Sequence, residues 1–187
     1  MDDNAKLNPP DHLPGERSRA EDIERMIRVD QAGEYGAVRI YAGQQAVLRG
    51  RASGRVVDRM ARQEEVHLEK FSDLMNERRM RPTVLGPVWH AAGFALGAAT
   101  ALMGEKAAMA CTVAIEEVID EHYQEQTDRL GDDDPELLSL IAECQADEVA
   151  HKEEALEQGA TKTPGYPLLS GAIKTGSRLA IWLSQRV

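Results

Sequence analysis

Aromatic residues are scarce in this sequence of 187 residues, which holds two tryptophans, four tyrosines and two phenylalanines. β-Sheets favour aromatic and β-branched side chains, whereas this chain is rich in the helix-favouring alanine, leucine, glutamate and methionine. Basic charge is also in short supply, because 22 lysines and arginines stand against 32 aspartates and glutamates, a formal net charge of -10. Binding nucleic-acid phosphates needs a basic face. The composition therefore predicts an all-α protein with no nucleic-acid partner.

Cysteine is limited to Cys111 and Cys144, which do not form a C-x-x-C motif. Both lie inside helical patterns, so we interpret them as reduced thiols packed in the core of a cytosolic protein. The N-terminal residues are polar, proline-punctuated and without an apolar stretch, so neither a secretory signal nor a transit peptide is predicted. Residues 1–19 are expected to form a flexible lead-in to one domain over residues 20–187.

Apolar residues recur with a period of about 3.6 in four segments long enough to be helices. The first runs over about residues 20–48, and the second follows the turn 50–54 and ends near residue 81. The third runs over residues 105–130 and the fourth over about residues 135–158. Gly131 is expected to end the third helix, and Asp134 with Pro135 to begin the fourth. Each pair is therefore predicted to form an antiparallel hairpin.

Residues 83–104 link the two hairpins and are apolar on every side, with His90 as their only ionisable group. Their glycines, proline and small side chains favour an embedded or interfacial helix over a full membrane span. The last segment, residues 166–186, predicts an amphipathic helix that carries Lys174, Arg178 and Arg186. Together the two segments predict attachment to a membrane surface with anionic headgroups. The alternative is that they cover the bundle or form an oligomer interface.

Six acidic or histidine residues occupy positions in the four helices where the pattern calls for apolar side chains. The first and third helices contribute one glutamate each, whereas the second and fourth contribute an E-x-x-H pair whose two side chains share one helix face. The inward set is Glu34, Glu64, His67, Glu116, Glu148 and His151. Burying unpaired carboxylates is costly, and no lysine or arginine lies on these faces. We therefore predict two divalent cations, with ligands that suit iron or manganese better than calcium.

The spacing within each hairpin brings the six residues to one level. Glu34 and Glu64 are equally distant from residue 49, beside the first turn, and Glu116 and Glu148 are equally distant from residue 132, inside the second. At about 1.5 Å per residue, both sets lie roughly 23 Å from their turns. The two halves form an internal repeat, and their ligand pattern is that of a ferritin-like four-helix bundle with a long crossover between the second and third helices.

Longer blocks of sequence resemble a known enzyme family. The blocks are VDQAGEYGAVRIYAGQ, QEEVHLEKF, ACTVAIEEVIDEHYQEQ, DEVAHKEEAL and the C-terminal GAIKTGSRLAIWLSQRV. From about residue 23 to the C-terminus they are similar to those of the demethoxyubiquinone hydroxylases, the di-iron monooxygenases of ubiquinone biosynthesis. The resemblance implies two iron ions, O2 as co-substrate, and hydroxylation of the benzoquinol ring of an isoprenoid quinol.

The resemblance also implies roles for individual residues. The same six residues would be the iron ligands, and the four glutamates, Glu34, Glu64, Glu116 and Glu148, would take part in catalysis by shifting to admit O2. Asp30 and Asp147 are candidates for orienting ligating histidines, with a plain surface role as the alternative. Tyr35, His122 and Tyr123 either serve proton or electron transfer near the substrate or only pack in the bundle.

The family further implies a peripheral membrane protein on the cytoplasmic face of the cell membrane. Its electron donor would be a separate reductase or a nicotinamide cofactor, and a lipid-presenting partner protein is left open. The sequence also leaves two other functions open. One is a ferroxidase or peroxidase of the rubrerythrin or ferritin type, and the other is a lipid-binding helical protein without enzymatic activity.

Overall fold

The computed structural model describes residues 17–186, and this range contains helices but no strand. The elements are α1 (Arg19–Leu48), α2 (Gly54–Glu77), α3 (Gly86–Leu102), α4 (Glu105–Leu130), α5 (Pro135–Glu157), the short 3-10 helix η1 (Ala160–Lys162) and α6 (Tyr166–Ser184). The all-α prediction is therefore confirmed for this part of the chain. The predicted lead-in over residues 1–19 lies mostly outside the described residues.

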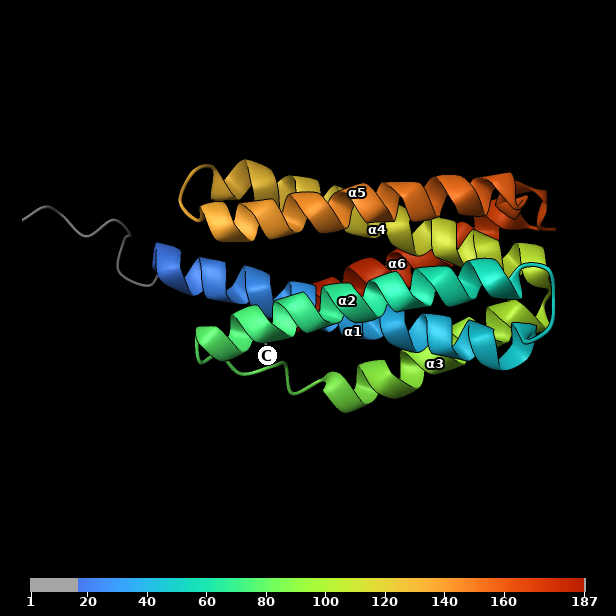
Figure 1. Ribbon diagram of the computed structural model, residues 1–187, viewed down its shortest axis with the longest axis horizontal. Helices are drawn as coiled ribbons and strands as arrows, with labels where there is room; N and C mark the ends of the chain where they lie inside the picture. Colours follow the sequence, from blue (N-terminus) through green and yellow to red (C-terminus); the bar gives the residue numbers. More distant parts are fainter. Residues whose placement is uncertain (1–16, 187) are drawn as a thin grey trace, which may run out of the picture.

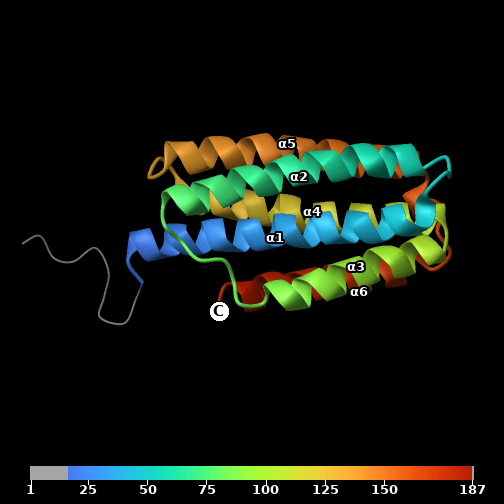
Figure 2. The same ribbon diagram turned by 60° about the horizontal axis from the view of Figure 1, so that its bottom comes forward.

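Helices α1, α2, α4 and α5 run side by side and form the predicted four-helix bundle (Figure 1). The α1–α2 and α4–α5 turns lie at opposite ends, because the crossover through α3 carries the chain back along the bundle before α4 begins. Figure 2 shows three layers, with α2 and α5 in one, α1 and α4 in the middle, and α3 and α6 in the third. The two segments outside the bundle thus cover the same side of it.

Most helix ends follow from the local sequence. Ser18 begins α1 with a capping box, in which its side chain accepts the Glu21 amide and the Glu21 carboxylate accepts the Ser18 amide. Asp134 caps α5 as predicted, by accepting the Leu137 amide at 3.1 Å. The predicted end of the second helix was wrong, because α2 ends at Glu77 instead of near residue 81.

The early end of α2 has a clear backbone cause. Arg79 adopts a left-handed conformation with φ of 56°, and the Met80 amide donates to the Met75 carbonyl at 2.8 Å. This is a Schellman-type ending, which glycine usually provides. An arginine in that conformation carries no sequence signature, so the periodic pattern alone extended the helix too far.

Two apolar clusters in the core of the bundle lie on either side of a polar layer. The cluster nearer the α1–α2 turn includes Leu48, Val57, Met60, Met109 and Val113. The cluster nearer the α4–α5 turn includes Ile27, Phe71, Leu130, Leu137 and Ile141. Each large apolar side chain that is fully buried contributes about 1.5–3 kcal/mol, so the two clusters can offset the cost of the polar layer.

Helix α3 packs unusually close to α1 because glycines replace side chains at the contact. A Cβ atom on Gly97 would lie 1.9 Å from the Ile40 carbonyl oxygen, and one on Gly43 would lie 2.2 Å from the Phe94 carbonyl oxygen. The absence of side chains at these glycines thus allows this apolar helix to pack directly against α1 of the bundle. Among the described residues, no helix has both the length and the apolar character that crossing a membrane requires.

Candidate metal centre

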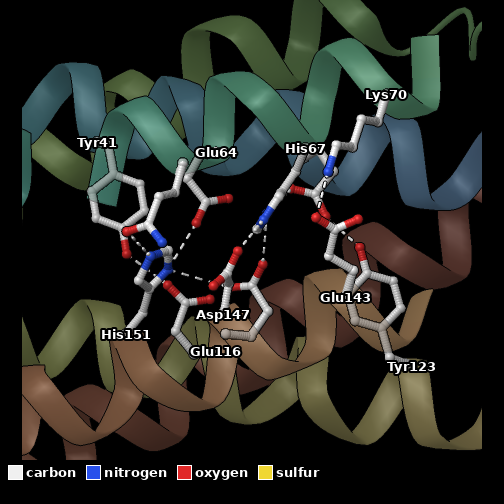
Figure 3. A network of polar contacts seen from close by, with 12 residues as sticks. Tyr41, Glu64, His67, Lys70, Glu116, Tyr123, Glu143, Asp147 and His151 are labelled. Carbon is white, nitrogen blue, oxygen red and sulfur yellow. Dashed lines mark hydrogen bonds and ion pairs between the residues drawn. The ribbon is translucent and has the colours of Figure 1, made fainter. Parts of the chain in front are cut away.

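The six residues predicted as ligands meet in the polar layer of the bundle. Each is at most 2% exposed, and α1 and α4 contribute one glutamate each while α2 and α5 contribute the E-x-x-H pairs. Figure 3 shows Glu64 and His67 of α2 pointing toward Glu116 and His151 from the opposite helices. The prediction that the two hairpins deliver these groups to one level agrees with this arrangement.

Two overlapping groups of side chains have ligand atoms that all lie within 4.8 Å of one another. One group is Glu34, Glu64, His67 and Glu148, and the other is Glu64, Glu116, Glu148 and His151. The glutamates of the two E-x-x-H pairs belong to both groups, whereas each remaining glutamate and each histidine belongs to one. The geometry is therefore that of two adjacent cation sites that share two carboxylates.

Within the described part of the chain, many polar atoms of this layer are buried without a hydrogen-bond partner. They are one carboxylate oxygen each of Glu34 and Glu116, both oxygens of Glu64 and Glu148, and the Nδ1 atoms of His67 and His151. No lysine or arginine in residues 17–186 is buried. Buried oxygens in such number need positive charge, and carboxylate with imidazole is a donor set that divalent transition metals accept. The residues present thus fit a pair of metal ions.

The outer nitrogen of each histidine is held by a residue of the facing helix. His67 Nε2 lies 3.0 Å from Asp147 Oδ2, and His151 Nε2 lies 3.1 Å from Gln63 Oε1. These contacts place a ring proton on Nε2, so that Nδ1 is the nitrogen that faces the carboxylates and is available to a metal ion when the ring is neutral. Asp147 was a candidate for this role, but Gln63 was missed. Its signal was its position directly before Glu64, which matches that of Asp147 before Glu148.

Two tyrosine hydroxyls bind Glu34 and Glu116, the two glutamates that each belong to only one of the two groups. Tyr41 donates to Glu116 Oε1 at 2.7 Å, and Tyr123 donates to Glu34 Oε1. Tyr41 fits the apolar pattern of α1, so the sequence did not mark it as a functional residue. Both rings are almost fully buried, and burial raises the pKa of both hydroxyls well above the usual value. Both tyrosines therefore remain hydrogen-bond donors.

Other candidates lie beside the centre without touching the predicted ligands. Asp30 is buried and accepts a hydrogen bond from Gln126 Nε2 at 2.6 Å, and its nearest histidine is His122, with Nε2 at 3.4 Å. The sequence had suggested that Asp30 orients one of the histidines predicted as ligands. The structure instead places Asp30 against His122. Tyr35 points to α3, where its hydroxyl lies 2.7 Å from His90 Nδ1.

Burial and crowding set the protonation of the metal-free centre. Burial raises the pKa of Glu34, Glu64 and Glu116, and the charge of Glu148 adds to this rise. For His67, burial lowers the pKa, but Glu148 and Glu34 outweigh this effect and raise it to about 11. Burial would raise the pKa of Glu148, but the neighbouring imidazoles of His151 and His67 outweigh this effect and lower it. The metal-free centre therefore holds protons where cations would otherwise balance the carboxylates.

Both cysteines are free and buried, as predicted. Burial raises the pKa of Cys111 to about 12. Cys144 was not recognised as a neighbour of the centre, but its sulfur lies within 4.8 Å of ligand atoms of Glu34 and His67. Burial, followed by the charges of these surroundings, raises the pKa of the Cys144 thiol as well, so it stays protonated in the metal-free protein.

Comparison with known proteins gives the family. Residues 21–184 match the family described as "Ubiquinone biosynthesis protein COQ7". The chain is 59% identical over 179 residues to the 3-demethoxyubiquinol 3-hydroxylase of Rhodospirillum rubrum, covering 95% of this chain and 84% of that protein. It is 50% identical over 169 residues to the human mitochondrial NADPH-dependent 3-demethoxyubiquinone 3-hydroxylase, covering 88% and 78%. The chain therefore belongs to the demethoxyubiquinone hydroxylase family of ubiquinone biosynthesis.

Proposed function

We propose that this protein is a 3-demethoxyubiquinol 3-hydroxylase whose centre holds two iron ions. The ligands would be the six residues of the two overlapping groups, Glu34, Glu64, His67, Glu116, Glu148 and His151. The single observation that carries the proposal is the buried, unpartnered donor set of these residues in a chain that is 59% identical to an enzyme of that name. The runner-up, a ferroxidase or peroxidase, would use the same ligands.

The reaction replaces one C–H bond of the quinol ring by a C–OH group. One oxygen atom of O2 enters the ring and the other leaves as water, so two electrons and two protons complete the balance. Two iron ions, when bound, supply the activation of O2. The human relative is named as NADPH-dependent, and on this basis we assign the electrons to a nicotinamide dinucleotide, with a separate reductase as the alternative.

The protein's own contribution is to orient the ligands and to exclude water. Asp147 and Gln63 fix the ring orientation of the two histidines, and Tyr41 and Tyr123 each hold one oxygen of a glutamate. The second oxygen of each of these glutamates stays free to bind a cation. Apolar clusters close the layer from both ends of the bundle, so the reacting groups lie in a site that bulk water does not fill.

A quinol with an isoprenoid tail resides in a membrane, and we propose that the α3–α6 layer contacts the membrane surface from the cytoplasmic side. This layer carries large apolar side chains that are exposed in the described structure, among them Val88, Leu102, Leu168, Leu179 and Trp182. Trp89 of α3 donates to the Ser184 hydroxyl of α6 at 3.1 Å. This hydrogen bond links the two helices, and the exposed apolar side chains that both carry support peripheral attachment.

The basic residues of α6 make contacts other than those expected from the sequence. Lys174 pairs with Glu117, and Arg178 pairs with Glu121 at 2.7 Å, so both bind α4. Arg186 lies 3.6 Å over the ring of Trp182. Because the charges of Lys174 and Arg178 are matched by glutamates of α4, we expect apolar area to drive attachment. Flotation with neutral and anionic vesicles should give similar binding, and binding to anionic vesicles alone would contradict this view.

The enzymatic proposal is tested by a single turnover with labelled oxygen. The protein is loaded with Fe(II) under anaerobic conditions, and demethoxyubiquinol is added in detergent. After 18O-labelled O2 is admitted, the quinone is extracted and its molecular mass is measured by mass spectrometry. We expect one labelled oxygen in the product and none with Glu148→Ala. Oxidised iron with unchanged quinone would move the function to ferroxidase chemistry. Equal quinone binding by both proteins without any bound metal would favour a lipid-binding protein.

A further inference from the structure

The two halves of the centre are built alike, so the positions where they differ distinguish one cation site from the other. The first difference is the residue that holds each histidine. His67 is held by the carboxylate of Asp147, whereas His151 is held by the neutral amide of Gln63. These residues occupy equivalent positions, each directly before the glutamate of an E-x-x-H pair.

A second difference lies one helical turn before Glu34 and Glu116, the glutamates that each belong to only one of the two groups. Asp30 precedes Glu34 by four residues, and Thr112 precedes Glu116 by four. Both are buried, and a glutamine contacts each, with Gln126 Nε2 at 2.6 Å from Asp30 Oδ1 and Gln44 Nε2 at 3.5 Å from Thr112 Oγ1. Both additional carboxyl groups, Asp30 and Asp147, therefore lie on the half formed by Glu34 and His67.

A carboxylate and an amide act differently on a ligating histidine. A hydrogen bond to an ionised acceptor is roughly twice as strong as a neutral one. Such a partner makes the opposite ring nitrogen a stronger donor to a metal, and losing it typically lowers metal affinity by about 10–100-fold. Of the two additional carboxyl groups, Asp147 matters more, because it contacts the histidine directly.

We propose that the two cation sites are unequal and that the site of Glu34 and His67 binds a divalent transition-metal ion more tightly than the site of Glu116 and His151. Asp147 and Gln63 are the positioning residues that set this order. The inference rests on the proposed metal centre and adds the order in which its two sites are filled by metal ions. We expect a difference in affinity of roughly tenfold, the lower end of the range for partners of ligating histidines.

The outer side of the centre can be altered without repacking the core. A cavity of about 330 Å³ opens between α2 and α5, and Gln63, His67 and Asp147 are among the residues that line it. The Asp147 side chain is 38% exposed. Glu143 lines the same cavity but pairs with Lys70 at 2.6 Å and touches neither histidine. Glu143→Gln is thus a matched control that removes a charge from the cavity without changing a histidine partner.

The test uses the full chain, freed of metal and given one equivalent of Mn²⁺ alone. Anomalous scattering from crystals of this sample measures the occupancy beside each histidine. In the unchanged protein, we expect more manganese beside His67 than beside His151. The double variant with Asp147→Asn and Gln63→Glu keeps the net charge and should reverse that order. Glu143→Gln should leave the order as it is.

Titration with Co²⁺, followed by its visible absorption, gives the affinities in solution. Asp147→Asn should weaken the tighter binding step by roughly tenfold, whereas Glu143→Gln should not. Equal occupancies in the unchanged protein, or an order that the double variant does not reverse, would overturn the inference while leaving the metal centre intact. No bound metal in the unchanged protein would instead remove the proposed centre itself.

Discussion

Tyr41 and Tyr123 occupy equivalent positions in the two halves of the bundle, and each donates its hydroxyl to the glutamate of the other half. Tyr41 lies seven residues after Glu34, and Tyr123 lies seven residues after Glu116. Seven residues are about two helical turns, so each tyrosine shares a face with one glutamate while binding the other across the α1–α4 contact. The internal repeat thus includes the tyrosines that bind the glutamates as well as the glutamates themselves.

Replacing either tyrosine by phenylalanine tests these bonds. Tyr41→Phe and Tyr123→Phe each remove a hydrogen bond to a buried carboxyl group, so we expect the free energy of unfolding to fall by about 1.5–3 kcal/mol. Urea denaturation measures this change. Tyr35→Phe is the matched control, because its hydroxyl bond to His90 lies in an exposed place and its loss should cost less than about 1 kcal/mol. Equal losses in all three variants would argue against a special role for the buried pair.

The stability of the metal-free protein should fall as the pH rises. Glu34, Glu64 and Glu116 have raised pKa values, so above the usual pKa of a glutamate the folded state holds protons that the unfolded chain has released. The pKa of His67 is raised to about 11. Its contribution to stability is therefore complete below the usual pKa of a histidine and is lost as the pH rises from there toward about 11. Both effects have the same sign between about pH 5 and about pH 9.

Metal should reverse this trend, because binding releases the same protons. At about 100 times the dissociation constant, free Mn²⁺ should add about 2.7 kcal/mol to the free energy of unfolding, and its dissociation constant should fall as the pH rises. Urea denaturation with and without Mn²⁺ at about pH 5.5 and about pH 8.5 measures both effects. A metal-free protein that is more stable at the higher pH would contradict the protonation scheme of the centre.

The buried cluster of glutamates and histidines was predictable from the sequence because its members break the apolar pattern of their helices. A glutamate such as Glu148 in an apolar stripe stands out, and the repeat of E-x-x-H gives its partners. Tyr41 and Gln63 were missed for the opposite reason. A tyrosine fits an apolar stripe, and a half-buried glutamine fits the edge of one, so neither breaks the pattern. Their importance depends on which side chain of another helix each one meets.

The segments outside the bundle show the same limit. The end of α4 and the start of α5 were predicted correctly because Gly131 and Pro135 mark them locally. The pairing of Lys174 with Glu117 could not be predicted, because it depends on how α6 is aligned along α4. Charges in a sequence do not show whether they face solvent, a membrane or another helix.

The contact between α3 and α1 gives the last prediction. A Cβ atom on Gly97 would lie 1.9 Å from the Ile40 carbonyl oxygen, a backbone atom that cannot move aside without bending α1. A Cβ atom on Gly171 of α6 would meet no atom of another described element within 4 Å, so the same substitution there adds helix propensity without a clash. Gly97→Ala should therefore lower the free energy of unfolding by about 3 kcal/mol or more, whereas Gly171→Ala should raise it by about 0.5–1 kcal/mol.

Urea denaturation separates the two, and the fluorescence of Trp89 on α3 reports whether that helix leaves the bundle. If both variants were equally stable, α3 would not be held against α1 by the close approach of their backbones.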